Sequence, residues 1–103
     1  MGMTVHTQLA GEKAKLSLNG RFDFTAHREF RQSYEEALKQ PGVKGVEVDL
    51  QGVHYIDSSA LGMLLLLKES ADRSRLPLAL INCTGSVRRV LEIANFGKLF
   101  SLS

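Results

Sequence analysis

Apolar and polar residues alternate with two different periods along this chain. Over residues 5–9 and 13–18 an apolar side chain stands at nearly every second position, as in the run Lys-Ala-Lys-Leu-Ser-Leu. A period of two is typical of a strand with one buried face. We therefore predict a hairpin that turns at Ala10-Gly11 and whose second strand closes at Asn19-Gly20.

From about residue 26 to residue 39 the period changes to that of a helix. The apolar positions that fall on one face are Phe30, Tyr34, Ala37 and Leu38. The segment Gln40-Pro41-Gly42 stops such a helix, because proline and glycine disfavour its continuation. Alternation with a period of two returns over residues 46–50 and predicts another strand.

A second helix is predicted from Ser58 or Ser59 to about Ser74, although a short apolar run could also be a buried strand. Leucine and methionine are good helix formers, and residues 57–74 contain no β-branched side chain. At about 100° per residue, one stripe of this helix is assigned to the core. Its members are Ala60, Met63, Leu64, Leu67 and Ala71.

The last third of the chain repeats the pattern. A short strand is predicted over Leu78–Ile81, then an amphipathic helix opened by Thr84 or Ser86 and ended near residues 95–97, then a strand over residues 99–102. The order β-β-α-β-α-β-α-β predicts an α/β fold with a mixed, mostly parallel sheet. In such sheets ligands and partners meet the carboxyl ends of the strands, where residues 52–57 are predicted to form a turn.

Composition narrows the class of protein. The chain has 103 residues, 44% hydrophobic residues and a formal charge of +2, which fits one compact domain over residues 3–102. Basic and acidic residues are interspersed, so nucleic acid is not an expected partner. The longest apolar run has five residues, against the roughly 20 of a membrane span. Because the chain has a single cysteine and no signal segment, we expect it in the cytoplasm. We also expect no membrane partner, and a monomer or a weak dimer.

Three adjacent residues at the predicted start of the second helix, Asp57, Ser58 and Ser59, are all good helix caps. One cap is sufficient, so at least one hydroxyl is left over near the positive end of the helix dipole. Around the helix, Ser58 shares a side with Leu61, Gly62 and Leu65 and lies outside the core stripe. An exposed strip with a hydroxyl at its head is a candidate partner surface.

The sequence gives weaker support to a catalytic triad, a metal site or a reactive thiol. His54, Asp57 and Ser58 are the residue types of a catalytic triad, but the pattern Gly-x-Ser-x-Gly is absent and closeness in sequence does not make triad geometry. The histidines lack metal-ligand spacing, and Cys83 lies in an apolar segment. We therefore expect no enzyme activity, no metal and no cofactor.

At these residues the chain resembles the STAS domain of bacterial anti-sigma factor antagonists. The segment VDLQGVHYIDSSALG, residues 48–62, is similar to that family's strand, loop and Asp-Ser-Ser/Thr-Gly-Leu-Gly helix entrance. Residues 18–24 resemble its Gly-x-hydrophobic-Asp turn, and residues 78–100 are more weakly similar. One departure is Ala60, where many members have glycine.

The resemblance implies a partner-switching regulator. In that family an anti-sigma factor that is also a serine kinase, or an analogous kinase, phosphorylates the serine after the aspartate, here Ser58, and a PP2C-type phosphatase reverses the modification. The unphosphorylated antagonist sequesters the anti-sigma factor. Partner contacts are expected at Asp23, Asp57, Ser59, Leu61, Gly62 and Leu65. The alternative is a constitutive interaction subunit of a transport or signalling complex, in which Ser58 only begins the helix.

Overall fold

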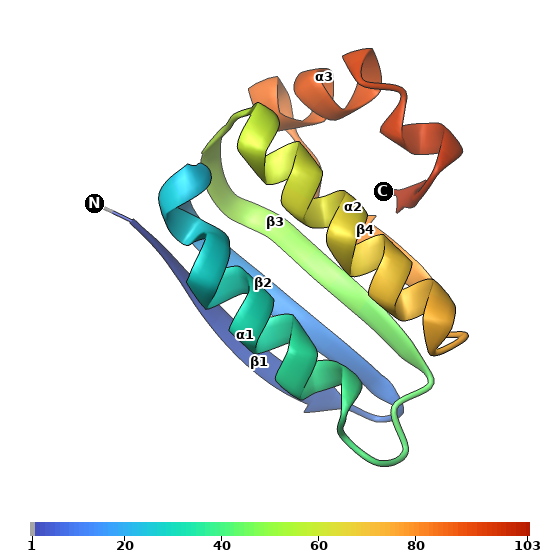
Figure 1. Cartoon of the computed structure of the whole chain (residues 1–103). Coiled ribbons are helices and arrows are strands. Elements are labelled where there is room, and N and C mark those ends of the chain that lie inside the picture. The colour runs from blue at the N-terminus through green and yellow to red at the C-terminus, as the bar shows by residue number, and fades with distance from the viewer. Residues whose placement is uncertain (1) are drawn as a thin grey trace.

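The computed structural model describes residues 2–103 (Figure 1). Its elements follow the predicted order β-β-α-β-α-β-α-β, with two short 3-10 helices added. They are β1 (Met3–Ala10), β2 (Lys13–Phe22), η1 (Phe24–Ala26), α1 (His27–Leu38), β3 (Gly45–Ile56), α2 (Ser58–Arg73), β4 (Leu78–Ile81), α3 (Gly85–Ile93), η2 (Phe96–Lys98) and β5 (Ser101–Leu102).

The strands form one sheet in the order β1-β2-β3-β4-β5, within the described residues. Strand β1 pairs with β2 antiparallel, and each later pair is parallel. The prediction of a mixed, mostly parallel sheet is therefore confirmed. Figure 1 shows α1 and α2 side by side across one face of the sheet, with α3 near the first turn of α2. No helix of residues 2–103 has the length and apolarity needed to cross a membrane.

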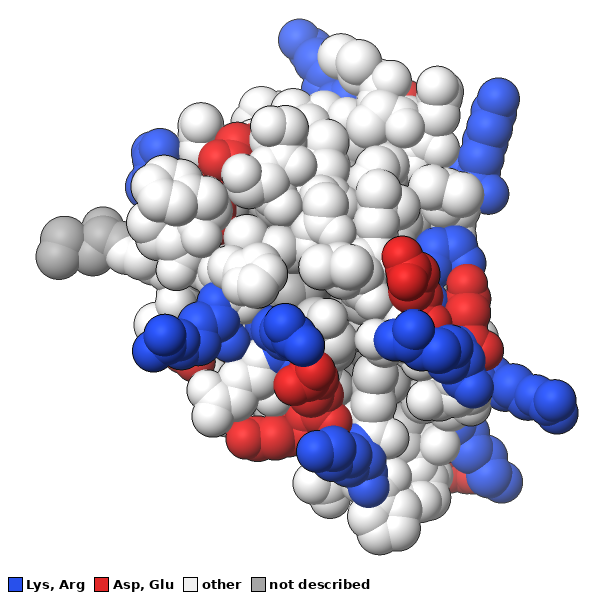
Figure 2. Space-filling view, in the orientation of Figure 1, with Lys and Arg blue, Asp and Glu red and all other residues white. Residues whose placement is uncertain are grey.

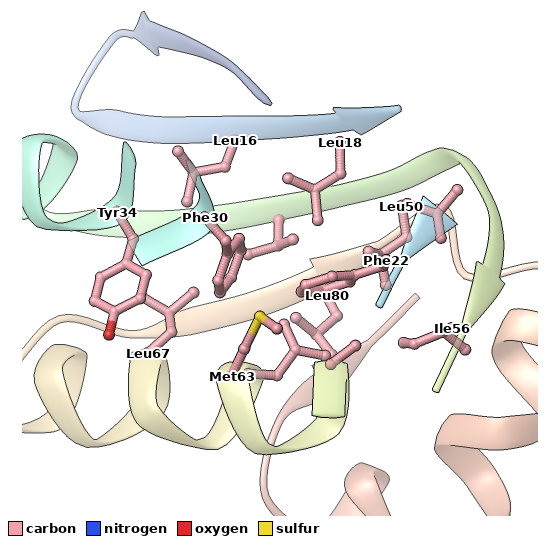
Figure 3. Close-up of a cluster of buried hydrophobic side chains, with 14 of the residues drawn as sticks. Leu16, Leu18, Phe22, Phe30, Tyr34, Leu50, Ile56, Met63, Leu67 and Leu80 are labelled. Carbon is pink, nitrogen blue, oxygen red and sulfur yellow. The ribbon is translucent and has the colours of Figure 1, made fainter. Parts of the chain in front are cut away.

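The core lies between the sheet and the helices (Figure 3). Leu16, Leu18 and Leu50 from the strands are completely buried, and Met63 and Leu67 of α2 point toward them. All five residues of the predicted core stripe of α2 are buried, which confirms that assignment. This packing fixes the rotation of α2 and hence which residues of the helix remain outside.

Strands β2 and β3 are longer than the sequence pattern indicates. Strand β2 passes through Asn19-Gly20 and ends at Phe22, so the prediction that it closes at Asn19-Gly20 is wrong. The pairing with β3 shifts register on both sides of these residues, and Gly20 has φ +113°, which favours glycine. Such irregularities interrupt the two-residue period without ending the strand.

The same extension corrects the expected turn over residues 52–57. Strand β3 continues to Ile56, which is paired with Phe22, and only Asp57 separates β3 from α2. Gly52 belongs to the strand, where the side chain of Asn19 fills the space beside it. The start of α2 is thus attached directly to the end of a central strand.

The sheet face away from α1 and α2 carries a polar network around Asp49, a buried carboxylate on β3. Its Oδ1 accepts hydrogen bonds from the side-chain amide of Asn82 and the backbone N–H of Gln51, both at 2.9 Å. Lys15 lies 3.5 Å from Oδ2. Burial raises the pKa of Asp49, but these hydrogen bonds and the lysine charge outweigh it, so the pKa lies below its ordinary value.

Candidate functional site

Asp57 is the N-cap of α2. Its Oδ1 accepts a hydrogen bond from the backbone N–H of Ala60 at 3.0 Å, and its backbone is extended, as a cap requires. Its carbonyl oxygen accepts the N–H of Leu61 at 3.2 Å. Of the three candidate caps in the sequence, the structure therefore selects the aspartate.

Ser58 and Ser59 occupy the first two positions of α2 and are both exposed. Because Asp57 makes the cap hydrogen bond, neither hydroxyl is needed to begin the helix. The two side chains diverge by about 100° around the helix axis. Ser58 is thus a hydroxyl on the surface at the positive end of a 16-residue helix.

Asp23 lies at the neighbouring strand end. Phe22 of β2 is paired with Ile56 of β3, and the backbone N–H of Asp57 donates to the carbonyl of Phe22 at 3.3 Å. The residues that follow the two strands, Asp23 and Asp57, therefore lie at the same end of the sheet, where β2 and β3 finish. The structure thus places Asp23, Asp57 and Ser58 at the same end of the sheet.

Asp23 is itself a cap, for η1. Its Oδ1 accepts the backbone N–H of Thr25 at 3.0 Å and the hydroxyl of the same residue. The Thr25 hydroxyl is the main cause that lowers the pKa of Asp23, and the nearby Arg21, with Nε 3.6 Å from Oδ2, adds to it. Asp23 is therefore an ionised group in the neutral pH range, and the site carries negative charge.

Two aromatic residues at this end of the sheet, Tyr55 and Phe24, were not among the predicted site residues. The guanidinium of Arg21 lies 4.0 Å from the ring centroid of Tyr55, a cation–π contact between paired positions of β2 and β3. Phe24 on η1 is 71% exposed. Nothing in the sequence distinguishes exposed Phe24 from buried Phe22 two residues earlier, so this residue could not have been selected beforehand.

The predicted strip on α2 is present with two changes of membership. Leu65 is 38% exposed, and apart from its chain neighbours and the backbone of its own helix no heavy atom lies within 4 Å of the position that a Cβ on Gly62 would occupy. Leu61 is partly buried and packs against the core, so the expectation that it is exposed is wrong. Leu66 is 44% exposed and was missed, although it also falls outside the core stripe by helical spacing.

Figure 2 shows how charge is distributed around this strip. Lysine, arginine and acidic side chains gather over α1 and the C-terminal part of α2, where Arg31 pairs with Glu35 at 3.2 Å and Lys68 with Asp72 at 2.9 Å. The surface over the first half of α2 is mostly uncharged. A partner that contacts Ser58, Gly62 and Leu65 would therefore dehydrate few charges, whereas Leu66 borders a hollow that is also lined by Arg31, Glu35 and Arg73.

Other candidate chemistry finds no geometric support. No group of three or more His, Cys, Asp or Glu residues could hold a metal ion within residues 2–103. His54 is exposed on β3. Cys83 is buried, and burial is the main cause that raises the pKa of its thiol, so it is a poor nucleophile near neutral pH.

The α/β fold with a five-stranded mixed sheet and three helices is shared with known proteins. The family model described as "Mlab, STAS domain" matches residues 5–102, and the chain belongs to the STAS domain family. A STAS-domain containing protein of Pseudomonas aeruginosa (strain UCBPP-PA14) is 42% identical over 103 residues, which are the whole of both chains.

Solved structures share the fold at low sequence identity. An anti-sigma factor antagonist from Mycobacterium paratuberculosis superposes with a TM-score of 0.87 at 17% identity, covering 98% of this chain and 85% of that one. The anti-sigma factor antagonist SpoIIAA in its unphosphorylated form gives 0.73 at 19% identity, covering 99% and 87%. The phosphorylated form of Bacillus SpoIIAA gives the same TM-score and identity, covering 97% and 91%.

Proposed function

We propose that this protein is an anti-sigma factor antagonist whose binding to its partner is switched by phosphorylation of Ser58. The observation that carries the proposal is the division of roles at the start of α2. Asp57 caps the helix with a 3.0 Å hydrogen bond, so the Ser58 hydroxyl stays exposed beside a weakly charged surface. We define the docking surface as Ser58, Gly62, Leu65 and Leu66, with Asp57 and Asp23 at its edge.

A phosphate on Ser58 is compatible with the fold. It adds about −1.5 to −2 charges at the N-terminus of α2, where backbone N–H groups and the helix dipole favour an anion. The side chain is exposed, so no buried group has to move. The likeness of this chain to SpoIIAA in both its unphosphorylated and its phosphorylated form supports this part of the proposal.

The same phosphate opposes binding. Burying the exposed parts of Leu65 and Leu66, 38% and 44% of these residues, contributes roughly 0.5–1.3 kcal/mol each before the costs of association. Removing a phosphate from water without a compensating partner costs at least as much. The carboxylate of Asp57 next to the phosphate adds to the negative charge that a partner would have to dehydrate, whereas the charge of Asp23 is partly balanced by Arg21. Binding is therefore lost while the fold is kept.

The proposed partner is an anti-sigma factor or an analogous protein with serine kinase activity, and a PP2C-type phosphatase restores the unmodified form. This assignment rests on membership of the STAS family and on the site, and the protein's own role in it is binding rather than catalysis. Asp57, Ser59 and Gly62 contact the partner, and Asp23 faces the kinase.

The proposal is tested with Ser58→Ala and Ser58→Asp as baits in a native extract, and Ser59→Asp is compared with them as a charge added at a neighbouring contact. Ser58→Ala should capture the partner continuously, Ser58→Asp should lose it, and Ser59→Asp should weaken capture less. Intact-mass analysis of the native protein should show one added phosphate that is absent from Ser58→Ala. Equal capture by Ser58→Ala and Ser58→Asp would contradict the switch and favour a constitutive interaction subunit.

A further inference from the structure

Strand β1 forms an edge of the sheet, two strands away from β3, the strand that leads into the docking surface. All eight of its residues pair with β2 on one side in an uninterrupted register from Met3 opposite Gly20 to Ala10 opposite Lys13. Its other side pairs with no strand of residues 2–103. Every second backbone N–H and C=O of β1 therefore points outward and needs a partner other than this chain.

This edge lacks the features by which sheet proteins block unwanted pairing. Natural edge strands are shortened, bulged, or marked by lysine, other charges or proline. Strand β1 is long and regular, and its sequence MTVHTQLA contains no charged residue and no proline. At the opposite edge β5 has only two residues, and such a short strand offers little backbone for pairing with another chain. The contrast singles out β1 as an edge kept available for pairing.

We propose that β1 pairs antiparallel with β1 of a second copy of this chain, forming a symmetric dimer with a ten-stranded sheet. Residues directly opposite each other in an antiparallel pair lie on the same face, so the two numbers in each pair must have an even sum. Two central registers satisfy this: one places His6 on the two-fold axis and the other places Thr7 there.

Burial selects the register with Thr7 on the axis. It sets Val5 of each copy opposite Leu9 of the other, on the face that the helices cover. Leu9 is 51% exposed and Val5 is partly buried in the single chain, so this pairing removes apolar surface from water at both ends of the strand. The alternative register would set Leu9 opposite Met3, which is already buried.

A second copy fits this edge because the strand is self-complementary: Val5 of each copy meets Leu9 of the other, and no charge opposes the pairing. Because β1 has no charge, self-pairing places no like charges opposite each other. The nearest charges on the neighbouring strand are already engaged, with Lys13 3.5 Å from Glu47 and Lys15 3.5 Å from Asp49. Both copies use the same edge, so assembly stops at two.

Sedimentation analysis of the purified chain over a range of concentrations tests the proposal. The unmodified protein should show a monomer–dimer equilibrium. Thr7→Lys, which places two lysines at the axis, should weaken dimerisation by about tenfold or more, which is about 1.4 kcal/mol. The matched control Gln51→Lys adds the same charge to an exposed residue of β3, away from the edge, and should leave the equilibrium unchanged.

Crosslinking tests the register. Cα atoms of directly opposite residues lie about 4.5–5.5 Å apart, within the range of a disulfide, whereas diagonal neighbours lie about 7–8 Å apart. Thr7→Cys should therefore form a disulfide-linked dimer on mild oxidation, and His6→Cys should not. The unmodified protein, whose one thiol is buried, should not crosslink.

A protein that stays monomeric at its highest soluble concentration would overturn the proposal and leave the edge to a strand from another protein. A dimer that Thr7→Lys leaves unchanged would overturn it as well, because the contact would then lie elsewhere. Crosslinking through His6→Cys but not Thr7→Cys would also overturn it. Binding through Ser58 can be present or absent in each case, so the two proposals fail independently.

Discussion

The side-chain amide of Asn82 donates a hydrogen bond of 2.9 Å to Oδ1 of Asp49 and so joins the end of β4 to the middle of β3. Asn82 has φ +56°, in the left-handed region that asparagine tolerates better than most residues. The contact fixes the path of the chain as it leaves β4 for α3. A buried carboxylate that receives two hydrogen bonds should contribute to stability in a pH-dependent way.

Replacing Asp49 with asparagine should lower the free energy of unfolding by roughly 1–3 kcal/mol at pH 7, because buried donors lose a charged acceptor. The pKa of Asp49 is lowered in the folded protein, so its stabilisation is present above the unfolded value of about 3.9 and is lost as pH falls through the folded value. Urea unfolding of both proteins from pH 7 to pH 3 checks this. A difference in stability that stays constant across that range would contradict the assignment.

Replacing Asp57, Ser58 and Ser59 one at a time should show which of these three residues caps α2. Asp57→Ala removes the acceptor of the Ala60 N–H and should cost about 1 kcal/mol. Ser58→Ala and Ser59→Ala remove exposed hydroxyls that do not cap the helix and should change stability by no more than about 0.5 kcal/mol. Thermal or urea unfolding measures all three. A larger loss for Ser58→Ala than for Asp57→Ala would assign the cap to the serine.

Leu64 and Leu65 are neighbours in sequence with opposite environments, since Leu64 is fully buried and Leu65 is partly exposed. Leu65→Lys should change the free energy of unfolding little, within about 0.5 kcal/mol, and strongly reduce capture of the partner. Leu64→Ala should instead cost about 2–5 kcal/mol. A large drop in melting temperature for Leu65→Lys would place that residue in the core.

Two glycines should respond in opposite directions to the same added methyl group. A Cβ on Gly52 would lie 2.0 Å from Oδ1 of Asn19 and 2.8 Å from the carbonyl oxygen of Leu18, so Gly52→Ala should destabilise the fold by about 1–3 kcal/mol. Gly62 is in a helix with open space around it, and Gly62→Ala should stabilise the fold by about 0.5–1 kcal/mol. Unfolding curves of both variants check the pair.

Much of the fold could be predicted because most elements keep a single period. Helices α1 and α2 begin and end within about two residues of their predicted bounds, and the core stripe of α2 follows from helical spacing alone. Strands β2 and β3 were predicted too short because register shifts near Asn19 and Gly20 break the two-residue alternation. A local pattern cannot show that a neighbouring strand compensates for such an irregularity.

Part of the candidate site could be predicted because α2 keeps a regular helical period. The exposure of Ser58 and Leu65 follows from their angle to the core stripe. The burial of Leu61 does not, because it depends on the elements that pack beside the first turn of α2. The choice of Asp57 among three possible caps also required coordinates, since all three residue types cap helices well.

Only Asp57 separates β3 from α2, and its N–H is bonded to the carbonyl of Phe22. A connection of one residue, anchored to the adjacent strand, has almost no conformational freedom to lose when a partner arrives. Recognition at this helix entrance therefore carries a small entropic penalty. Regulation there does not require the backbone to move, because a change in surface chemistry alone alters what a rigid scaffold presents.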